Sequence, residues 1–146
     1  MVRSEPRRRE VRFVHADVYN PSGSSDPYTI PVAPSSQDLV MSQSLFSHLL
    51  DRELNQYLRE GFRVLADGGH MAMSAFCLDH MREREHVGGR WPFPHRMGPA
   101  YVQDTRYPEA AVAYEPEYLV EAARACGFAT AEILPYPIQS LLVAGK

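Results

Sequence analysis

The sequence predicts an α/β fold built on a doubly wound sheet, and two stretches of the chain carry this prediction. Residues 37–77 run from a short apolar segment through an amphipathic helical segment to a second apolar segment that lacks charged side chains. A strand without a charged face is typical of a parallel sheet covered on both sides. This stretch therefore predicts a β-α-β unit, and residues 116–144 predict a further helix and two strands.

Length and composition limit the class of protein. The chain of 146 residues fits one domain, and a hydrophobic content of 45% is enough for a core. A net charge of -3 argues against a broad nucleic-acid surface. Residues 1–10 are basic and lack the apolar stretch of a secretory signal. We expect them to be a flexible, solvated leader. With no apolar run of spanning length, we expect no membrane partner.

The first predicted strand spans residues 11–16 and ends at Asp17. A carboxylate just beyond the carboxyl end of a strand lies at the edge where open α/β sheets bind ligands. The alternative is that Asp17 caps a turn. Residues 20–36 hold four prolines, five serines and one glycine, which predicts an extended surface loop.

The central unit begins with a strand over residues 38–41, followed by polar Ser42, Gln43 and Ser44. Asp51 is the candidate N-cap of a helix, and the Gly68-Gly69 pair is predicted to stop it. The apolar stripe of this helix has the spacing of one helical face, at Leu54, Tyr57, Leu58, Gly61, Phe62 and Leu65.

His48 lies near the start of this helical region, and two interpretations stay open. Imidazole titrates near neutrality, so His48 is a candidate general base. The alternative is a histidine that packs at a helix start and bonds to the backbone.

Residues 78–115 form an insertion that is first charged and then rich in aromatic residues and proline. Such a segment inside a compact domain predicts a lid or a binding loop. The alternative is that its aromatic side chains cover a sheet edge or a dimer partner. We predict no metal site. The possible ligands have a spacing that fits no common zinc pattern: Cys77, Asp79, His80, His86 and His95.

The last part of the chain predicts a helix that starts near Pro116, with Gly127 as its stop. Strands are predicted over residues 128–134 and 139–144. Cys77 and Cys126 lie far apart in apolar patterns, which predicts buried free thiols and a cytoplasmic protein.

The motifs of the central unit resemble the middle of the class I S-adenosylmethionine-dependent methyltransferases. DLVMSQSLFSHL and YLREGFRVLADGGHMAMSAF are similar to that family's fourth strand, polar loop, helix and fifth strand. Leu65-Ala66-Asp67-Gly68-Gly69 matches the family's leucine-(lysine or arginine)-proline-glycine-glycine turn except at two positions. The resemblance implies a Rossmann-like sheet whose last strand inserts antiparallel between its two neighbours.

The resemblance also implies a site. The cofactor would be S-adenosylmethionine, with Asp17 and Val18 facing adenine and with Ser42, Gln43 and Ser44 beside the methionine part. A small-molecule acceptor would lie near His48, the candidate catalytic residue, and near four aromatic residues: Phe46, Trp91, Phe93 and Tyr101.

One part of the family pattern has no counterpart in the sequence. The nine glycines never form the GxGxG turn that opens the family's domain, and the acidic second strand is also missing. Residues 11–146 are therefore expected to form a partial, truncated domain. We expect a partner that supplies the remaining strands, or a homodimer, because an unpaired apolar edge promotes association. The hypotheses are a methyltransferase, or a C-terminal fragment of one, and a catalytically inactive binding or dimerisation module.

Overall fold

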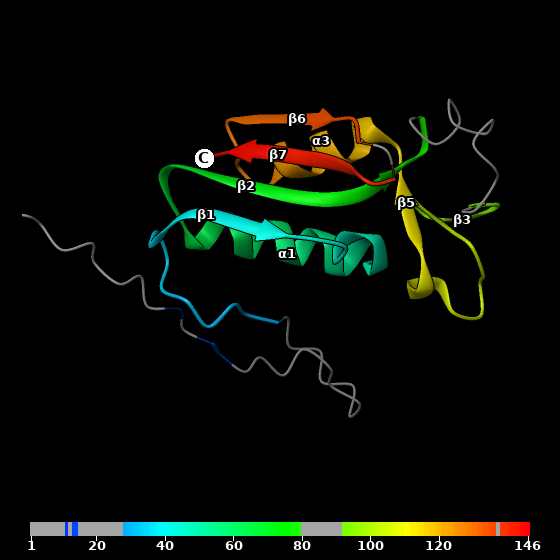
Figure 1. The fold of residues 1–146 in the computed structure, drawn as a ribbon, viewed down its shortest axis with the longest axis horizontal. Helices are drawn as coiled ribbons and strands as arrows, with labels where there is room; N and C mark the ends of the chain where they lie inside the picture. Colours follow the sequence, from blue (N-terminus) through cyan, green and yellow to red (C-terminus); the bar gives the residue numbers. More distant parts are fainter. Residues whose placement is uncertain (1–10, 12, 15–27, 80–91, 137) are drawn as a thin grey trace, which may run out of the picture.

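The computed structural model describes residues 11, 13–14, 28–79, 92–136 and 138–146 (Figure 1). Seven strands form one sheet, and two α-helices, α1 (Asp51–Val64) and α3 (Pro116–Ala125), pack on it. Two short 3-10 helices are η1 (Phe46–His48) and η3 (Pro108–Ala110). The strands are β1 (Gln37–Ser42), β2 (Leu65–Cys77), β3 (His95–Met97), β4 (Ala100–Val102), β5 (Val112–Tyr114), β6 (Thr130–Leu134) and β7 (Ser140–Gly145).

The main part of the sheet has the order β1-β2-β7-β6. β1 and β2 are parallel and are joined by α1, which confirms the predicted β-α-β unit. β7 lies antiparallel between β2 and β6, which confirms the predicted arrangement of the last strand. The register places Val40 beside Met71 and Met41 beside Ala72, which in turn pairs with Val143, so these two rows lie on opposite faces.

Both helices cover the same face of the main sheet. Figure 1 shows α1 and α3 behind the strands β1, β2, β7 and β6. Side chains of this covered face are fully buried, among them Leu58 of α1, Met73 of β2 and Leu119 of α3. On the opposite face, which we call the open face, Leu39 and Met41 are 59% and 72% exposed. Along β1 and β7, the described residues thus pack only the covered face.

Gly61 brings α1 close to β2. A Cβ at this position would lie 2.2 Å from Sδ of Met71, which is buried on the covered face. A glycine in a helix interior costs about 1 kcal/mol relative to alanine, so its presence here reflects this close approach.

The predicted glycine stop of α1 is wrong. The helix ends at Val64, and Gly68 and Gly69 lie inside β2, with Gly68 at φ +76°. Between the pairs Gln37–Leu65 and Leu39–His70, β1 advances by two residues and β2 by five, so the glycines form an irregular bulge.

The end of α1 is capped instead by distant groups. Ser35 and Ser36 donate their backbone N–H groups to the carbonyls of Arg63 and Val64. Lys146 Nζ donates to the carbonyls of Phe62 (3.1 Å) and Leu65 (2.7 Å). Because these carbonyls have partners, the helix end needs no following left-handed glycine.

The predicted N-cap is also wrong by one position. Leu50 is the N-cap residue and makes no side-chain cap, while Asp51 is the first residue of α1. The carboxylate of Asp51 instead accepts hydrogen bonds from the Asn55 amide and the Tyr118 hydroxyl. It therefore joins α1 to α3. The helix predicted to start near Pro116 and stop at Gly127 is confirmed as α3, with Pro116 in its first turn and Gly127 at φ +109° beyond its end.

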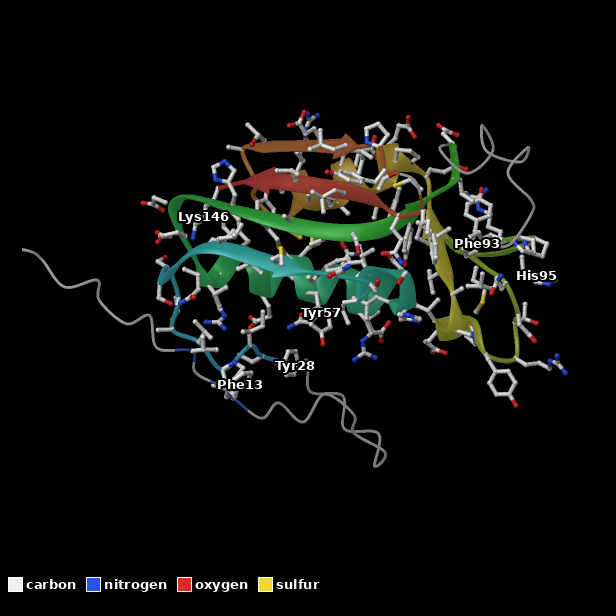
Figure 2. All side chains as sticks on the ribbon, viewed as in Figure 1. Phe13, Tyr28, Tyr57, Phe93, His95 and Lys146 are labelled. Carbon is white, nitrogen blue, oxygen red and sulfur yellow. The ribbon has the colours of Figure 1, made fainter. Side chains whose placement is uncertain are left out.

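The described part of the insertion contains three strands that the sequence did not predict. β3 and β4 form a hairpin around Gly98 (φ +62°), and β4 pairs with β5, which lies beside the end of β2. A second apolar cluster forms here, with Phe93 and Tyr101 packed on Phe76, Leu78, Ala111 and Ala113. Figure 2 shows Phe93 and His95 at this end of the molecule, far from Lys146.

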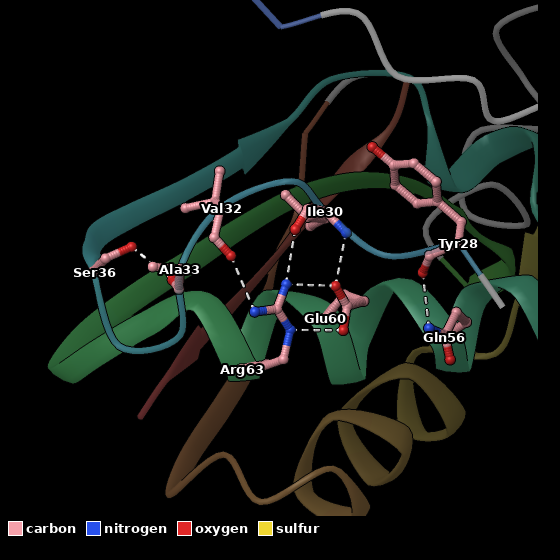
Figure 3. Close-up of polar contacts among 8 residues, drawn as sticks. All are labelled: Tyr28, Ile30, Val32, Ala33, Ser36, Gln56, Glu60 and Arg63. Carbon is pink, nitrogen blue, oxygen red and sulfur yellow. Dashed lines mark hydrogen bonds and ion pairs between the residues drawn. The ribbon is translucent and has the colours of Figure 1, made fainter.

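Residues 28–36 form a strap along the outer side of α1 (Figure 3). Arg63 donates to both carboxylate oxygens of Glu60 at 2.8 Å and to the carbonyls of Ile30 and Val32. The N–H of Ile30 donates to Glu60, which is 7% exposed. The hydrogen bond from Arg63 holds the pKa of the Glu60 carboxyl below its usual range. The surface loop expected here is therefore tied to the helix.

The predicted first strand is described only at Val11, Phe13 and Val14, where no strand is formed and the side chains are exposed. Asp17, Val18 and Trp91 lie outside the described residues. None of the helices in the described part of the chain has the length and apolar content needed to cross a bilayer.

Candidate functional site

A groove of about 500 Å³ opens at the carboxyl end of β1. Volumes of this size are typical of small-molecule sites. The predicted cofactor residues Ser42, Gln43 and Ser44 form one wall. The rest of the lining comes from β1, β2, β7 and the loop before β7: Met41, Ser74, Tyr136, Ile138, Gln139 and Leu141.

A hydrogen-bond network joins the two sides of the groove. The backbone N–H of Ser44 donates to the hydroxyl of Ser74 at 2.7 Å. That hydroxyl donates to Oε1 of Gln139 at 2.7 Å, and the Ser44 hydroxyl approaches the same oxygen at 3.3 Å. The end of β1 is thus fixed to β2 and to the β6–β7 loop, although these groups are distant in sequence.

Ser44 has an unusual backbone conformation. Its φ of 58° lies in the left-handed region, which costs a non-glycine residue about 1 kcal/mol or more. Beside it, the hydroxyl oxygen of Ser42 is buried and has no hydrogen-bond partner among the described residues. Strained backbone and unpaired buried polar atoms are both uncommon and occur preferentially at ligand sites.

These groups fit part of S-adenosylmethionine. The unpaired Ser42 hydroxyl and the side chains of Gln43 and Ser44 offer donors and acceptors that suit the amino and carboxyl groups of its methionine part. The residues expected beside adenine, Asp17 and Val18, lie outside the described part of the chain.

His48 lies at the end of η1 and does not line the groove. Its Nδ1 is 2.8 Å from the carbonyl oxygen of Glu109. A carbonyl only accepts, so Nδ1 must carry the proton in this contact, and neutral His48 then has a basic Nε2. The side chain is exposed, and the contact joins η1 to η3.

Of the predicted acceptor residues, the three that the structure describes do not line the groove. Phe46 is 1% exposed and packs edge-on to Tyr57 in the main core. The ring centroids of Phe93 and Phe76 are 5.3 Å apart, and the guanidinium carbon of Arg96 lies 5.7 Å from the ring centroid of Tyr101. Phe93 and Tyr101 therefore belong to the second apolar cluster, which fits the alternative that these aromatics cover a sheet edge.

Sequence reasoning missed the other side of the groove. Ser74 lies within an apolar strand, and Gln139 follows a proline-rich turn, so neither has a local sequence signal. The one hint was that Ser74 is a polar residue in a largely apolar strand.

Neither cysteine has the environment of a reactive thiol. Cys77 is buried, which raises the pKa of its thiol to about 11, and burial also raises the pKa of half-buried Cys126. Among the described residues, the carboxylates of Asp79, Glu115 and Glu117 lie close enough together to hold a cation. Exposed acidic groups often cluster without one. His80 and His86, two of the possible metal ligands in the sequence, lie outside the described residues.

Comparisons with known proteins identify similar chains among methyltransferases. A family model described as a methyltransferase domain matches residues 2–73. An S-adenosylmethionine-dependent methyltransferase from Methanosarcina mazei has 20% identity and a TM-score of 0.54, over 81% of this chain and 63% of that protein. A Thermotoga maritima protein described as a possible histamine N-methyltransferase has 15% identity and a TM-score of 0.51, over 80% and 59%.

A third similar structure contains ligands. It is the Burkholderia thailandensis 1,6-didemethyltoxoflavin-N1-methyltransferase with bound 1,6-didemethyltoxoflavin and S-adenosylhomocysteine. Its identity is 17% and its TM-score is 0.50, over 78% of this chain and 45% of that protein. The chain thus spans less than two thirds of the length of each of these proteins.

Proposed function

We propose that this chain, which belongs to the class I S-adenosylmethionine-dependent methyltransferases, binds S-adenosylmethionine at the carboxyl end of β1 and positions it for methyl transfer to a small molecule. The observation that carries the proposal is the groove at this end of the strand, walled by Ser42, Gln43 and Ser44. Ligands of open α/β sheets bind beyond the carboxyl ends of the strands, where this groove lies.

The residues of this chain would orient the cofactor and control the polarity around it. When bound, S-adenosylmethionine supplies an electrophilic methyl group. Ser42 and Ser44 hold the methionine part, and the network through Ser74 keeps that wall rigid. Apolar Ile138 and Leu141 limit the access of water on the other wall.

His48 is the proposed general base for an acceptor that must lose a proton. The Glu109 carbonyl holds its Nδ1–H, so Nε2 is free to take the proton. Because His48 lies outside the groove lining, the acceptor would have to extend from the groove toward η1.

Calorimetric titration with S-adenosylhomocysteine tests cofactor binding. We expect micromolar affinity, and we expect Ser42→Ala to weaken it about 2- to 10-fold, the range of one net hydrogen bond. Ser36→Ala is the matched control, because Ser36 lies in the strap and bonds to the carbonyl of Ala33. Loss of affinity in both variants, or in neither, would contradict the assignment of Ser42.

The open face favours a second candidate function, a binding or dimerisation module. Leu39, Met41 and Ile138 are exposed there, and the outer edge of β1 has no strand partner among the described residues. An exposed apolar sheet face with a free edge is an association surface. A second copy of the chain, or a polypeptide that supplies further strands, would cover it.

Sedimentation velocity separates the two candidates when it is combined with the titration. A dimer that binds no S-adenosylhomocysteine and is dissociated by Met41→Asp would favour the module. A chain that binds S-adenosylhomocysteine favours the enzyme in either oligomeric state.

A further inference from the structure

The amide of Gln139 is held in one orientation. Its Oε1 receives the Ser74 hydroxyl at 2.7 Å and lies 3.3 Å from the Ser44 hydroxyl. The Ser74 hydroxyl already accepts the N–H of Ser44, so its own proton is directed to Gln139. Since both hydroxyls meet Oε1, the two Nε2 protons must point away from this network.

Nε2 of Gln139 is left as a donor beside the groove. Gln139 lines the groove, and no hydrogen bond from its Nε2 is found among the described residues. A half-buried amide of this kind is satisfied by solvent or by an acceptor atom of a ligand. The site is thus prepared for a group that accepts a hydrogen bond.

The other residues that line the groove indicate what kind of molecule would carry this hydrogen-bond acceptor. Met41, Ile138 and Leu141 supply apolar surface, and Tyr136 supplies an aromatic ring. None of the described residues that line the groove is charged. On the side of Ile138 and Leu141, away from Ser42, Gln43 and Ser44, the lining therefore suits an uncharged, apolar body.

We propose that Gln139 recognises a carbonyl oxygen on an uncharged, apolar acceptor substrate that lies in this groove. The proposal rests on the proposed function, because it names the substrate class of the same site. Gln139 sets specificity by donating from Nε2, and Ser74 is a positioning residue that fixes Oε1. A ligand that covers this donor without offering an acceptor would leave it unpaired, so the donor discriminates against such a ligand.

Two probe molecules of similar shape test this recognition. Acetophenone carries a carbonyl oxygen, and ethylbenzene is its hydrocarbon analogue. We expect acetophenone to shift the Gln139 side-chain amide resonances in a ¹H–¹⁵N spectrum. We also expect it to bind about 3- to 10-fold more tightly than ethylbenzene.

Two variants and a control make the test specific. Gln139→Met keeps the length of the side chain but removes the amide, and should abolish the preference without changing ethylbenzene affinity. Ser74→Ala should reduce the preference, because the amide is then free to rotate. Gln56→Met is the matched control, since Gln56 bonds to the Tyr28 carbonyl in the strap. It should leave the preference unchanged.

Three outcomes would overturn the proposal: equal affinity for both probes, shifts confined to residues outside the groove, or a preference that survives in Gln139→Met. Binding of S-adenosylhomocysteine is measured without an acceptor. A chain that binds it but shows no carbonyl preference contradicts this inference alone. A chain that fails to bind it contradicts the proposed function, whatever the probes show.

Discussion

The two faces of the main sheet are built for different tasks. On the covered face, side chains from β1, β2 and β7 meet two helices, and most are fully buried. On the open face, the same strands present Leu39, Met41 and Leu141 to the groove and to the surroundings. Because strand residues alternate between faces, one strand serves both tasks.

This difference separates stability from function within each strand. In β2, Met73 packs in the core, and its neighbour Ser74 holds the groove network. In β1, Val40 packs against the core, and Met41 lines the groove. Substitutions one residue apart should therefore act on different properties, which the following predictions test.

The largest contrast is expected between two leucine truncations. Leu58→Ala removes a fully buried side chain between α1 and the sheet, and should lower the free energy of unfolding by about 2–5 kcal/mol. Leu39→Ala removes a side chain that is 59% exposed, and should cost less than about 1 kcal/mol. Urea denaturation measures both. Equal losses would mean that the open face is packed in solution, as in a dimer.

Gly61→Ala tests how closely the covered face is packed. The new Cβ would meet Met71 Sδ at 2.2 Å, which forces a buried methionine to move. We expect a loss of about 1–3 kcal/mol, despite the better helix propensity of alanine. A stability gain in the same denaturation assay would show that α1 and β2 are loosely packed.

Glu60→Gln tests the outer layer of the covered face. It removes the charge that accepts bonds from Arg63 and Ile30, so we expect a loss of about 1–2 kcal/mol at neutral pH. The pKa of Glu60 is lower in the folded chain than its ordinary value of 4.5, so this stabilisation is present above that pH and is lost as the pH falls through the folded pKa. The variant should therefore lose less stability on acidification than the parent chain. Parallel acid curves would contradict the strap.

The smallest effects are expected at two serines with positive φ. Ser35 (φ 51°) lies in the strap and Ser44 (φ 58°) lies at the groove. Ser35→Gly relieves strain and should stabilise the chain by a few tenths to about 1 kcal/mol. Ser44→Gly also loses the contact with Gln139, so its gain should be smaller. Thermal unfolding compares them, and a larger gain at Ser44 would mean that its network contributes nothing.

The sequence predicted the elements whose signals are local. The apolar stripe of α1 up to Phe62, the uncharged strand over residues 70–77 and the proline and glycine that flank α3 each appear within a few residues, and the structure confirms them. Leu65, the last residue of the predicted stripe, lies in β2 instead. Period and turn chemistry suffice for such elements.

The errors arose where distant groups decide the local structure. Gly68-Gly69 resembles a helix stop, but Ser35, Ser36 and Lys146 already satisfy the end of α1. The strands of the insertion depend on pairing with the end of β2, which no window of the sequence contains. In the site, Ser42, Gln43 and Ser44 were predicted to lie together and do line the groove. Their partners Ser74 and Gln139 come from segments that only the sheet order brings near.

The most direct test of the account is a ¹H–¹⁵N titration of the labelled chain with S-adenosylhomocysteine. The account predicts that the backbone amides of Ser42, Gln43 and Ser44 shift, together with that of Ser74, because the carboxyl end of β1 holds the cofactor's methionine part. Amides in the strap and the β3–β4 hairpin should stay in place. An unchanged spectrum at saturating ligand, or shifts that avoid these residues, would contradict the proposed cofactor site.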